Sequence, residues 1–241
     1  MTELCRSKTP EEAAEAFASR LLQLVAGSGD FHWALSGGST PGILFDLLAR
    51  DYVSRMPWPK IHFWWGDERC VPPSDAESNY QTVFDRLFRK VPVREDQIHR
   101  IKGELPPEEA CSQYSTEIRS HVKTRDALPS FDLIMLGIGD DGHTASIFPD
   151  QMELLTSGRI CEVATHPGTG QKRVSLTGPV LSNARYLYFL VTGLSKATCI
   201  ARIVNKEKSA SGLPAYHIFP SGDGRLAFFL DQDAASGINT R

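Results

Sequence analysis

Residues 131–149 read FDLIMLGIGDDGHTASIFP, an apolar run that leads into a loop rich in glycine. The run from Phe131 to Leu136 has the length of a buried strand, and the glycines after it indicate a loop at its carboxyl end. Open α/β sheets bind their ligands at that end of their strands. Asp140, Asp141 and His143 give the loop two carboxylates and an imidazole, which can act as acceptor, orienting group and base near neutral pH. We therefore expect a catalytic loop here.

Two other interpretations of this loop remain open. Gly137, Gly139 and Gly142 have the spacing of the dinucleotide-binding fingerprint, which requires a strand before it and a long helix after it. Pro149 follows soon after Gly142 and makes that helix doubtful, while the neighbouring aspartates would repel a pyrophosphate. The third interpretation is a structural glycine turn with His143 on the surface.

Strands and helices alternate along the chain. Thr9, Pro10 and Glu12 form the pattern of a capping box, which starts a helix that ends near Val25. Further strands are expected at 31–35, 61–65, around 98, 131–136, 173–176, 186–191 and 228–230, and further helices at 41–50, 80–88, 107–122 and 195–204. This alternation predicts a three-layer α/β fold, with a mostly parallel sheet and helices on both of its faces. The 241 residues, 41% of them hydrophobic, suffice for one domain spanning residues 1–241.

Composition narrows the classes of function. The formal net charge is −3 and the pI is near 6.2, and basic residues do not cluster with aromatic ones, so we expect no nucleic-acid partner. The cysteines are odd in number and lack a C-x-x-C pair, which indicates reduced thiols. Residues 1–10 lack an apolar leader, and no run approaches the ~20 apolar residues that span a bilayer. We expect a cytoplasmic protein with no membrane partner.

Four loops are expected to meet at one edge of the sheet. In a parallel sheet, each turn from a strand into a helix lies at the carboxyl end of the strand. The loops at 36–40, 66–80, 137–146 and 193–196 should therefore converge.

The first of these loops has the features of a phosphate cradle. Gly38, Ser39 and Thr40 offer hydroxyl groups and unobstructed amides at the positive end of a helix. An ordinary turn in which Thr40 is the N-cap of the helix is the alternative. The loop is not a Walker A motif, because the lysine and the spacing are missing.

The second loop concentrates charge just after a strand that contains Trp64 and Trp65. Arg69 can hold a phosphate or carboxylate through paired hydrogen bonds, and Asn79 can bind a sugar hydroxyl or support Asp67. A merely solvated surface is the alternative for this segment.

Two further cations, Arg173 and Lys196, fall on the same predicted edge. Each alone is typical of a surface charge. Together with the loop that contains Ser39 and Thr40, they favour a site for a phosphorylated small molecule.

The sequence gives no support for a metal site or a cofactor. Asp140, Asp141 and His143 contain ligand atoms, but no H-x-x-x-H or further His/Cys spacing accompanies them. We expect structural or surface roles for the other histidines, which are His32, His62, His99, His121, His166 and His217.

Taken together, these motifs resemble those of the 6-phosphogluconolactonases, and the resemblance extends from about Leu35 through the helix after Lys196. The motifs that carry it are LSGGSTP at 35–41, GDER at 66–69, ESNY at 77–80, GIGDDGHTAS at 137–146 with Phe148-Pro149, RVSLT at 173–177, and Gly193 with Lys196-Ala197. The resemblance implies a modified doubly wound α/β sheet, a fold that this family shares with the glucosamine-6-phosphate isomerase/deaminases.

The resemblance favours hydrolysis over isomerisation. In the deaminases a similar turn is followed by Asn-Glu-Pro, whose glutamate helps to orient the histidine. This chain has Ile147, Phe148 and Pro149 there, so that carboxylate is missing. Arg69 also differs, because the deaminases carry tyrosine at that position.

The resemblance implies ester hydrolysis of 6-phospho-D-glucono-1,5-lactone without metal or cofactor. His143 would be the general base, and Asp141 would fix its tautomer and stabilise the imidazolium. Loop amides near Gly142, or the side chain of Arg69 or Asn79, are the candidate donors to the oxyanion. The expected substrate-binding and phosphate-binding residues are Gly38, Ser39, Thr40, Asp67, Arg69, Asn79, Gly142, Arg173 and Lys196, of which Ser39, Thr40, Arg173 and Lys196 are assigned to the phosphate.

Two alternatives of different classes remain. One is an isomerase or deaminase of an amino-sugar phosphate, and the other is a non-catalytic sugar-phosphate sensor. Such sensors usually carry a DNA-binding segment, for which the residues before Thr9 leave no room. The expected partner is a small sugar-phosphate lactone, and the expected assembly is a monomer or weak homodimer.

Overall fold

The computed structural model describes residues 2–239, and its centre is a six-stranded sheet. The strand order is β1-β11-β10-β7-β2-β3, and each neighbouring pair runs parallel. The strands are β1 (Thr2–Arg6), β2 (Phe31–Leu35), β3 (Ile61–Trp65), β7 (Leu133–Leu136), β10 (Tyr186–Val191) and β11 (Arg225–Leu230). Both faces of β2 and β7 are buried, which explains why these strands are continuously apolar rather than alternating.

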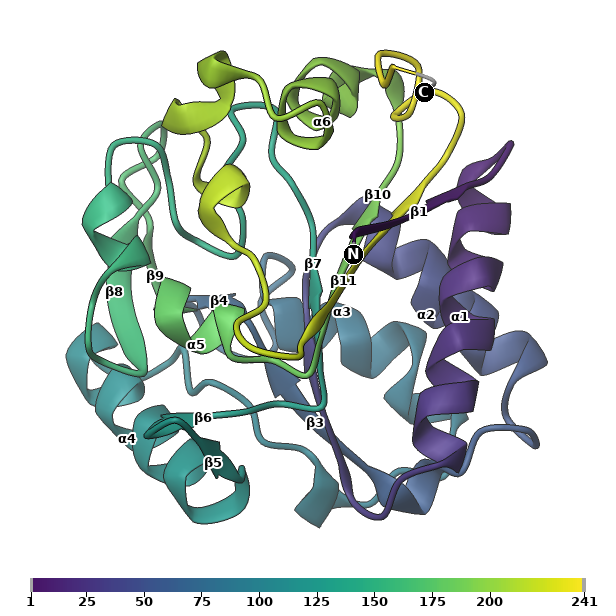
Figure 1. Ribbon diagram of the computed structural model, residues 1–241. Helices are drawn as coiled ribbons and strands as arrows, with labels where there is room; N and C mark the ends of the chain where they lie inside the picture. Colours follow the sequence, from purple (N-terminus) through teal and green to yellow (C-terminus); the bar gives the residue numbers. More distant parts are fainter. Residues whose placement is uncertain (1, 240–241) are drawn as a thin grey trace.

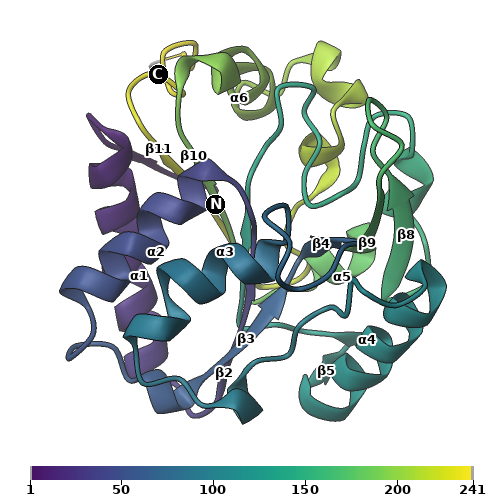
Figure 2. The same cartoon turned by 180° about the vertical axis from the view of Figure 1, so that it is seen from behind.

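Helices cover both faces of this sheet. Figures 1 and 2 show α1, α2 and α3 on one side, and α4, α5 and a small antiparallel sheet on the other. The helices are α1 (Pro10–Ala26), α2 (Ser39–Asp51), α3 (Asn79–Arg86), α4 (Pro107–His121), α5 (Gly178–Ser182) and α6 (Ala197–Val204). The antiparallel sheet has the order β4 (Asp67–Arg69), β9 (Lys172–Leu176) and β8 (Cys161–Thr165). The predicted three-layer α/β architecture is confirmed.

Short elements complete the chain. A two-stranded ladder joins β5 (Thr124–Arg125) to β6 (Leu128–Pro129), and 3-10 turns occupy Trp58–Lys60, Phe88–Lys90, Glu95–Gln97, Met152–Leu155, Leu194–Lys196, Lys208–Gly212 and Pro214–His217. No helix within residues 2–239 has the length and apolar character needed to cross a membrane.

Helix α1 shows how local sequence and packing agree. The Thr9 hydroxyl accepts a hydrogen bond from the Glu12 amide at 3.2 Å, as expected of the capping box. The buried face of the helix includes Phe17, whose ring lies 5.8 Å from Tyr188 on β10 and 5.1 Å from Phe229 on β11. Edge-to-face aromatic contacts of this kind fix the helix against the sheet.

The order of the strands reverses between β2 and β7. From β2 the sheet grows outward to β3, whereas from β7 it grows in the opposite direction through β10 and β11. The connections that leave the carboxyl ends of β2 and β7 therefore diverge and open a crevice between them. This crevice is where a ligand site is expected in a doubly wound fold.

The start of α2 differs from the prediction. The helix begins at Ser39 with Gly38 as its N-cap, at φ +106°, and no side chain caps it. The expectation that Thr40 caps the helix is wrong, because its hydroxyl bonds to the hydroxyl of Thr192 at 2.8 Å. A glycine fits the N-cap here because this positive φ disfavours a side chain.

Several predicted boundaries also shift. The strand predicted at 131–136 begins at Leu133, and the strand predicted around residue 98 is a single bridge between Ile98 and Phe63. The last strand begins earlier than predicted, at Arg225, and the helix predicted at 195–204 is divided into a 3-10 turn and α6. The sequence does not predict strands β1, β4, β5, β6 and β8 or helix α5.

The loop after β7 does not lead into a helix. Residues 137–151 contain no helix, and the next element is the 3-10 turn Met152–Leu155. The dinucleotide-binding interpretation is therefore wrong, since it requires a helix that starts at the third glycine.

Candidate active site

A cavity of about 220 Å³ lies at the carboxyl ends of β2 and β7. We call it the switch-point cavity. All four loops that were expected to converge contribute to it. Its lining consists of Ser36, Gly37, Gly38, Ser39, Thr40, Pro41, Asp67, Arg69, Asn79, Gly137, Ile138, Gly139, His143, Ala145, Arg173, Leu190, Val191 and Lys196.

A histidine–aspartate pair stands at one wall of the cavity. The Nδ1 atom of His143 lies 2.6 Å from Oδ1 of Asp141, and the same oxygen accepts the His143 backbone N–H at 3.0 Å. A carboxylate can only accept, so Nδ1 donates its proton to Asp141, and in the neutral ring the lone pair is therefore on Nε2. Burial raises the pKa of Asp141, but the hydrogen bonds and charge of His143 outweigh burial and lower it. The pair is thus arranged for base catalysis at Nε2.

The loop around this pair is closed on itself. The Gly139 amide donates to the His143 carbonyl at 2.9 Å, and the Thr144 hydroxyl donates to the Gly137 carbonyl at 2.8 Å. A Cβ atom at Gly139 would lie 2.1 Å from Nδ1 of His143 and 2.8 Å from Oδ1 of Asp141. Glycine at 139 therefore leaves the space that the imidazole and the carboxylate occupy.

Two arginines face the cavity from the antiparallel sheet. Arg69 on β4 is paired directly with Arg173 on β9, and like charges in that position repel each other. Both Nε atoms are buried and have no hydrogen-bond partner within residues 2–239. Burial lowers the pKa of Arg173, and the charge of Arg69 lowers it further. A negatively charged ligand in the cavity would ease this repulsion, and its acceptor atoms could satisfy the buried donors.

A buried glutamate organises the loop beside these arginines. The carboxylate of Glu68, which is 3% exposed, accepts hydrogen bonds from the backbone N–H groups of Arg69, Asn79 and Tyr80 at 2.7–2.8 Å and from the Ser78 hydroxyl at 3.0 Å. Burial raises the pKa of Glu68, and the backbone hydrogen bonds offset part of that rise. This network fixes the first turn of α3 against β4.

The position of Asn79 depends on that network and on a glycine. Its side-chain amide donates to the Asp67 carbonyl at 2.9 Å. A Cβ atom at Gly37 would lie 1.8 Å from Oδ1 of Asn79. The cavity can therefore accommodate Asn79 only because residue 37 has no side chain.

Lys196 reaches the cavity from the turn before α6. Its Nζ atom lies 2.5 Å from Oδ1 of Asp140, and the lysine side chain is 24% exposed. The hydrogen bond and charge of Lys196 lower the pKa of Asp140. Lys196 is thus held at the mouth of the cavity by a residue of the glycine-rich loop.

Most of the predicted site residues come together in the cavity. Those that line it are Gly38, Ser39, Thr40, Asp67, Arg69, Asn79, His143, Arg173 and Lys196. Asp141 lies behind His143 and does not line the cavity. Gly142 does not line it either. Its amide donates to the Gly139 carbonyl at 3.0 Å, and a Cβ atom at this position would lie 2.7 Å from the side chain of Leu213.

Sequence reasoning missed Gly37 and Glu68 as parts of the site. Gly37 could have been noticed because it stands next to Gly38, and the turn needs only one glycine. Glu68 could have been noticed because it lies between Asp67 and Arg69 at the end of a strand. Neither clue shows which side chains Gly37 and Glu68 contact in the folded protein.

Four of the remaining histidines, for which structural or surface roles are expected, lie close together in the structure. His32, His62 and His99 stack in succession, and His99 also packs against His121. Within residues 2–239, one group of three side chains lies close enough to hold a metal ion. It consists of His99, Glu117 and His121, and it lies outside the cavity.

The class of protein that this fold and cavity define is an α/β enzyme for a small anionic substrate. The chain belongs to the family described as glucosamine-6-phosphate isomerases/6-phosphogluconolactonase, whose model matches residues 6–228. It is 44% identical over 183 residues to a 6-phosphogluconolactonase of Treponema pallidum, with 76% of each chain covered. It is 37% identical to a 6-phosphogluconolactonase of Aggregatibacter actinomycetemcomitans, over 94% of this chain and 96% of the relative.

A solved structure shares the fold of this chain. The crystal structure of a devB protein matches this fold with a TM-score of 0.94 and 38% sequence identity, over 99% of this chain and all of the other. The resemblance that the motifs indicated is thus confirmed across the chain.

Proposed function

We propose that this chain hydrolyses 6-phospho-D-glucono-1,5-lactone to 6-phospho-D-gluconate, the second step of the oxidative pentose phosphate pathway. The observation that carries the proposal is the pairing of Arg69 with Arg173 in the same cavity as His143. A negatively charged substrate accounts for two arginines side by side in the cavity. Hydrolysis of an ester needs a base to activate water, which accounts for His143. The relatives named 6-phosphogluconolactonase support the choice of substrate.

In the proposed mechanism, His143 is the general base. Its Nε2 atom takes a proton from a water molecule as the water oxygen attacks C1 of the lactone. Asp141 accepts the Nδ1–H bond and stabilises the imidazolium that forms. The tetrahedral intermediate collapses with cleavage of the bond between C1 and the ring oxygen. That oxygen takes the proton from Nε2 and becomes the C5 hydroxyl group. C1 becomes a carboxylic acid, which releases its remaining proton to solvent and gives the carboxylate.

The other cavity residues would bind and orient the substrate. Ser39, Thr40, Arg173 and Lys196 are assigned to the 6-phosphate, which anchors the sugar for attack. The Gly142 amide already has an acceptor. We therefore favour the side chains of Arg69 and Asn79, rather than that amide, as the donors to the oxyanion.

The segment that follows His143 disfavours an isomerase or deaminase. Phe148 is 1% exposed and its ring lies 4.9 Å from the His143 ring, with Ile147 fully buried beside it. An apolar wall therefore occupies the segment where the deaminases resembling this chain carry a glutamate. Release of ammonia from glucosamine 6-phosphate would contradict this interpretation.

The decisive experiment measures hydrolysis of freshly generated lactone. Wild type, His143→Ala and buffer are compared side by side, because the lactone also opens spontaneously. Acceleration by wild type, with a loss of at least ~10²-fold in His143→Ala, is expected. Wild-type rates no faster than buffer, together with tight binding of 6-phosphogluconate, would indicate a sensor instead.

Three further properties are part of the proposal. The reaction would need no metal or cofactor, so activity should survive a chelator. A cytoplasmic location is supported by the cysteines, all five of which are free. A monomer or weak homodimer is proposed, and sedimentation at several concentrations would test it.

A further inference from the structure

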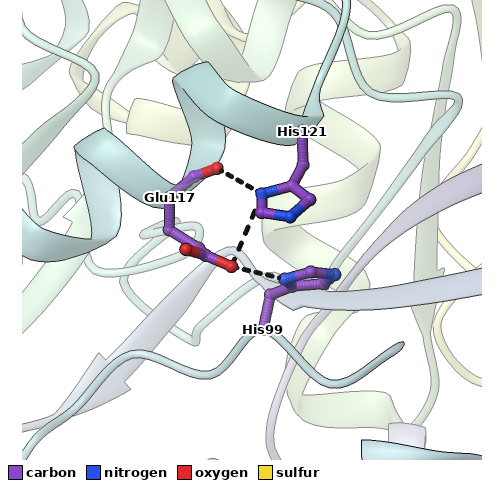
Figure 3. Close-up of side chains that lie close together, drawn as sticks. All are labelled: His99, Glu117 and His121. Atoms are coloured by element: carbon purple, nitrogen blue, oxygen red, sulfur yellow. Dashed lines mark hydrogen bonds and ion pairs between the residues drawn. The ribbon is translucent and has the colours of Figure 1, made fainter. Parts of the chain in front are cut away.

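A second cluster of titratable side chains lies outside the switch-point cavity. His99 follows the bridge between Ile98 and β3, and Glu117 and His121 lie one turn apart at the carboxyl end of α4. Figure 3 shows the two imidazoles and the carboxylate pointing toward one another. His62 and His32 of the same stack belong to the amino-terminal halves of β3 and β2, whereas the cavity lies at the carboxyl ends.

The distances within this cluster fit a small metal ion. Oε1 of Glu117 lies 2.8 Å from Nδ1 of His99 and 3.5 Å from Nδ1 of His121, and the ligand atoms of all three lie within 4.8 Å of one another. A tetrahedral zinc ion with bonds of about 2.0–2.1 Å separates its ligand atoms by roughly 3.3 Å. The Glu117 and His121 side chains are partly exposed, so they have room to adjust toward that spacing.

We propose that His99, Glu117 and His121 form a zinc-binding site that ties α4 to the segment after β3. Two imidazole nitrogens and one carboxylate oxygen suit Zn²⁺ better than Mg²⁺ or Ca²⁺, which prefer oxygen ligands. Solvent supplies the fourth ligand, since the exposed fractions of the Glu117 and His121 side chains are 44% and 41%.

The surroundings of His99 support this role. Its other ring nitrogen, Nε2, lies 3.0 Å from Nδ1 of His62, and its ring stacks on Trp64 with centroids 4.0 Å apart. Ligating histidines usually engage their second nitrogen in a hydrogen bond that fixes the ring. With Nδ1 on the metal, Nε2–H donates to His62, so His62 acts as a positioning residue.

Two cations that line the same pocket as His99 and Glu117 are held by other partners. Arg100 pairs with Glu104 at 2.7 Å, and Nζ of Lys102 bonds to Gln113 at 3.2 Å. Neither interaction uses the carboxylate of Glu117. The carboxylate therefore contacts the two imidazoles rather than a lysine or arginine.

Hydrogen bonding alone offers a competing explanation of the cluster. Nδ1 of His121 lies 3.0 Å from both the Glu117 carbonyl and the Ser120 hydroxyl, and a metal ion would replace these contacts. The explanations differ in one measurable respect, because only a metal site binds Zn²⁺ with a defined stoichiometry through these side chains.

The test is calorimetric titration of the chelator-treated, full-length protein with Zn²⁺. One ion per chain is expected in wild type, with at least about tenfold weaker binding in His121→Ala and in Glu117→Gln. Glu109→Gln, which alters another exposed glutamate on α4, should bind like wild type. Mg²⁺ should give no binding at this site.

Two additional arms make the result specific. His143→Ala should bind zinc like wild type. This result would show that the zinc ion does not bind at the catalytic loop. His121→Ala should keep normal lactone hydrolysis, and zinc should raise the melting temperature of wild type but not of this variant. The zinc proposal would be overturned by unchanged zinc affinity in both His121→Ala and Glu117→Gln, or by a dissociation constant above about 100 μM in wild type. Neither outcome would bear on the proposed lactonase activity.

Discussion

Oδ1 of Asp141 accepts two hydrogen bonds from His143, one from ring Nδ1 at 2.6 Å and one from the backbone N–H at 3.0 Å. The two contacts fix the ring relative to its own backbone and select the tautomer with Nε2 unprotonated. Asp141→Asn keeps the shape but can present an amide hydrogen to Nδ1 and select the opposite tautomer. We expect a fall in kcat of roughly 10–10²-fold with KM nearly unchanged. A steady-state comparison with wild type tests this, and a loss confined to KM would contradict it.

Gly139 provides a second test of the same pair. A methyl group at this position would occupy the space of Nδ1 of His143, at 2.1 Å, so Gly139→Ala must displace the ring. Gly137→Ala is the matched control, because its Cβ would meet only the Ser36 hydroxyl at 3.8 Å. We expect at least about a tenfold loss of kcat for Gly139→Ala and a much smaller change for Gly137→Ala. Equal effects would mean that the loop, rather than the ring position, responds to substitution.

Lys196 should affect substrate binding more than turnover. It pairs with Asp140 at 2.5 Å at the mouth of the cavity, where it can also meet the phosphate. Lys196→Ala is expected to raise KM by about tenfold or more with a smaller change in kcat. Lys8→Ala, at an exposed lysine that does not line the cavity, should leave both constants unchanged. An unaltered KM in Lys196→Ala would remove this residue from the phosphate site.

Glu68 should contribute mainly to stability and to the order of the loop that holds Asn79. Its carboxylate accepts four hydrogen bonds in a buried setting, two at each oxygen, and Glu68→Gln would turn an NH₂ group toward two of those donors. We expect a loss of unfolding free energy of about 2–4 kcal/mol, measured by urea denaturation. The exposed Glu77→Gln is the control and should lose less than about 0.5 kcal/mol. Equal stability of the two variants would show that the network tolerates an amide.

The sequence alone predicts the sheet and much of the cavity because both depend on local patterns. Apolar runs at 31–35 and 186–191 match β2 and β10, and the capping box at Thr9 matches the start of α1. Loops placed at the carboxyl ends of parallel strands must lie on one edge, so their convergence follows from the connectivity.

Other features depend on contacts that no local pattern contains. Strand β1 is polar and mostly exposed, and it is held by its pairing with β11 rather than by burial. The apposition of Arg69 and Arg173 requires the register of two segments that are far apart in the chain. The histidine cluster likewise assembles only when α4 packs beside the edge of the sheet.

His32 gives a prediction on the pH dependence of stability. It is 9% exposed, and its Nδ1 atom accepts a hydrogen bond from Trp64 at 3.1 Å. Burial, aided by the charge of His62 and partly opposed by Asp132, lowers the pKa of His32 to about 4. Between pH 6.5 and 4 the unfolded chain therefore binds a proton that the folded protein does not, so stability falls as the pH decreases through this range.

His32→Asn should remove this contribution while keeping an acceptor for Trp64. In urea denaturation between pH 7.5 and pH 5, wild type is expected to lose up to about 1.4 kcal/mol per pH unit more than the variant below pH 6.5. A chelator in every sample removes any contribution from zinc. Because His62 and His99 remain in both proteins, their titration largely cancels in the difference. Parallel pH profiles for the two proteins would mean that His32 accepts a proton in the folded state as readily as in the unfolded chain.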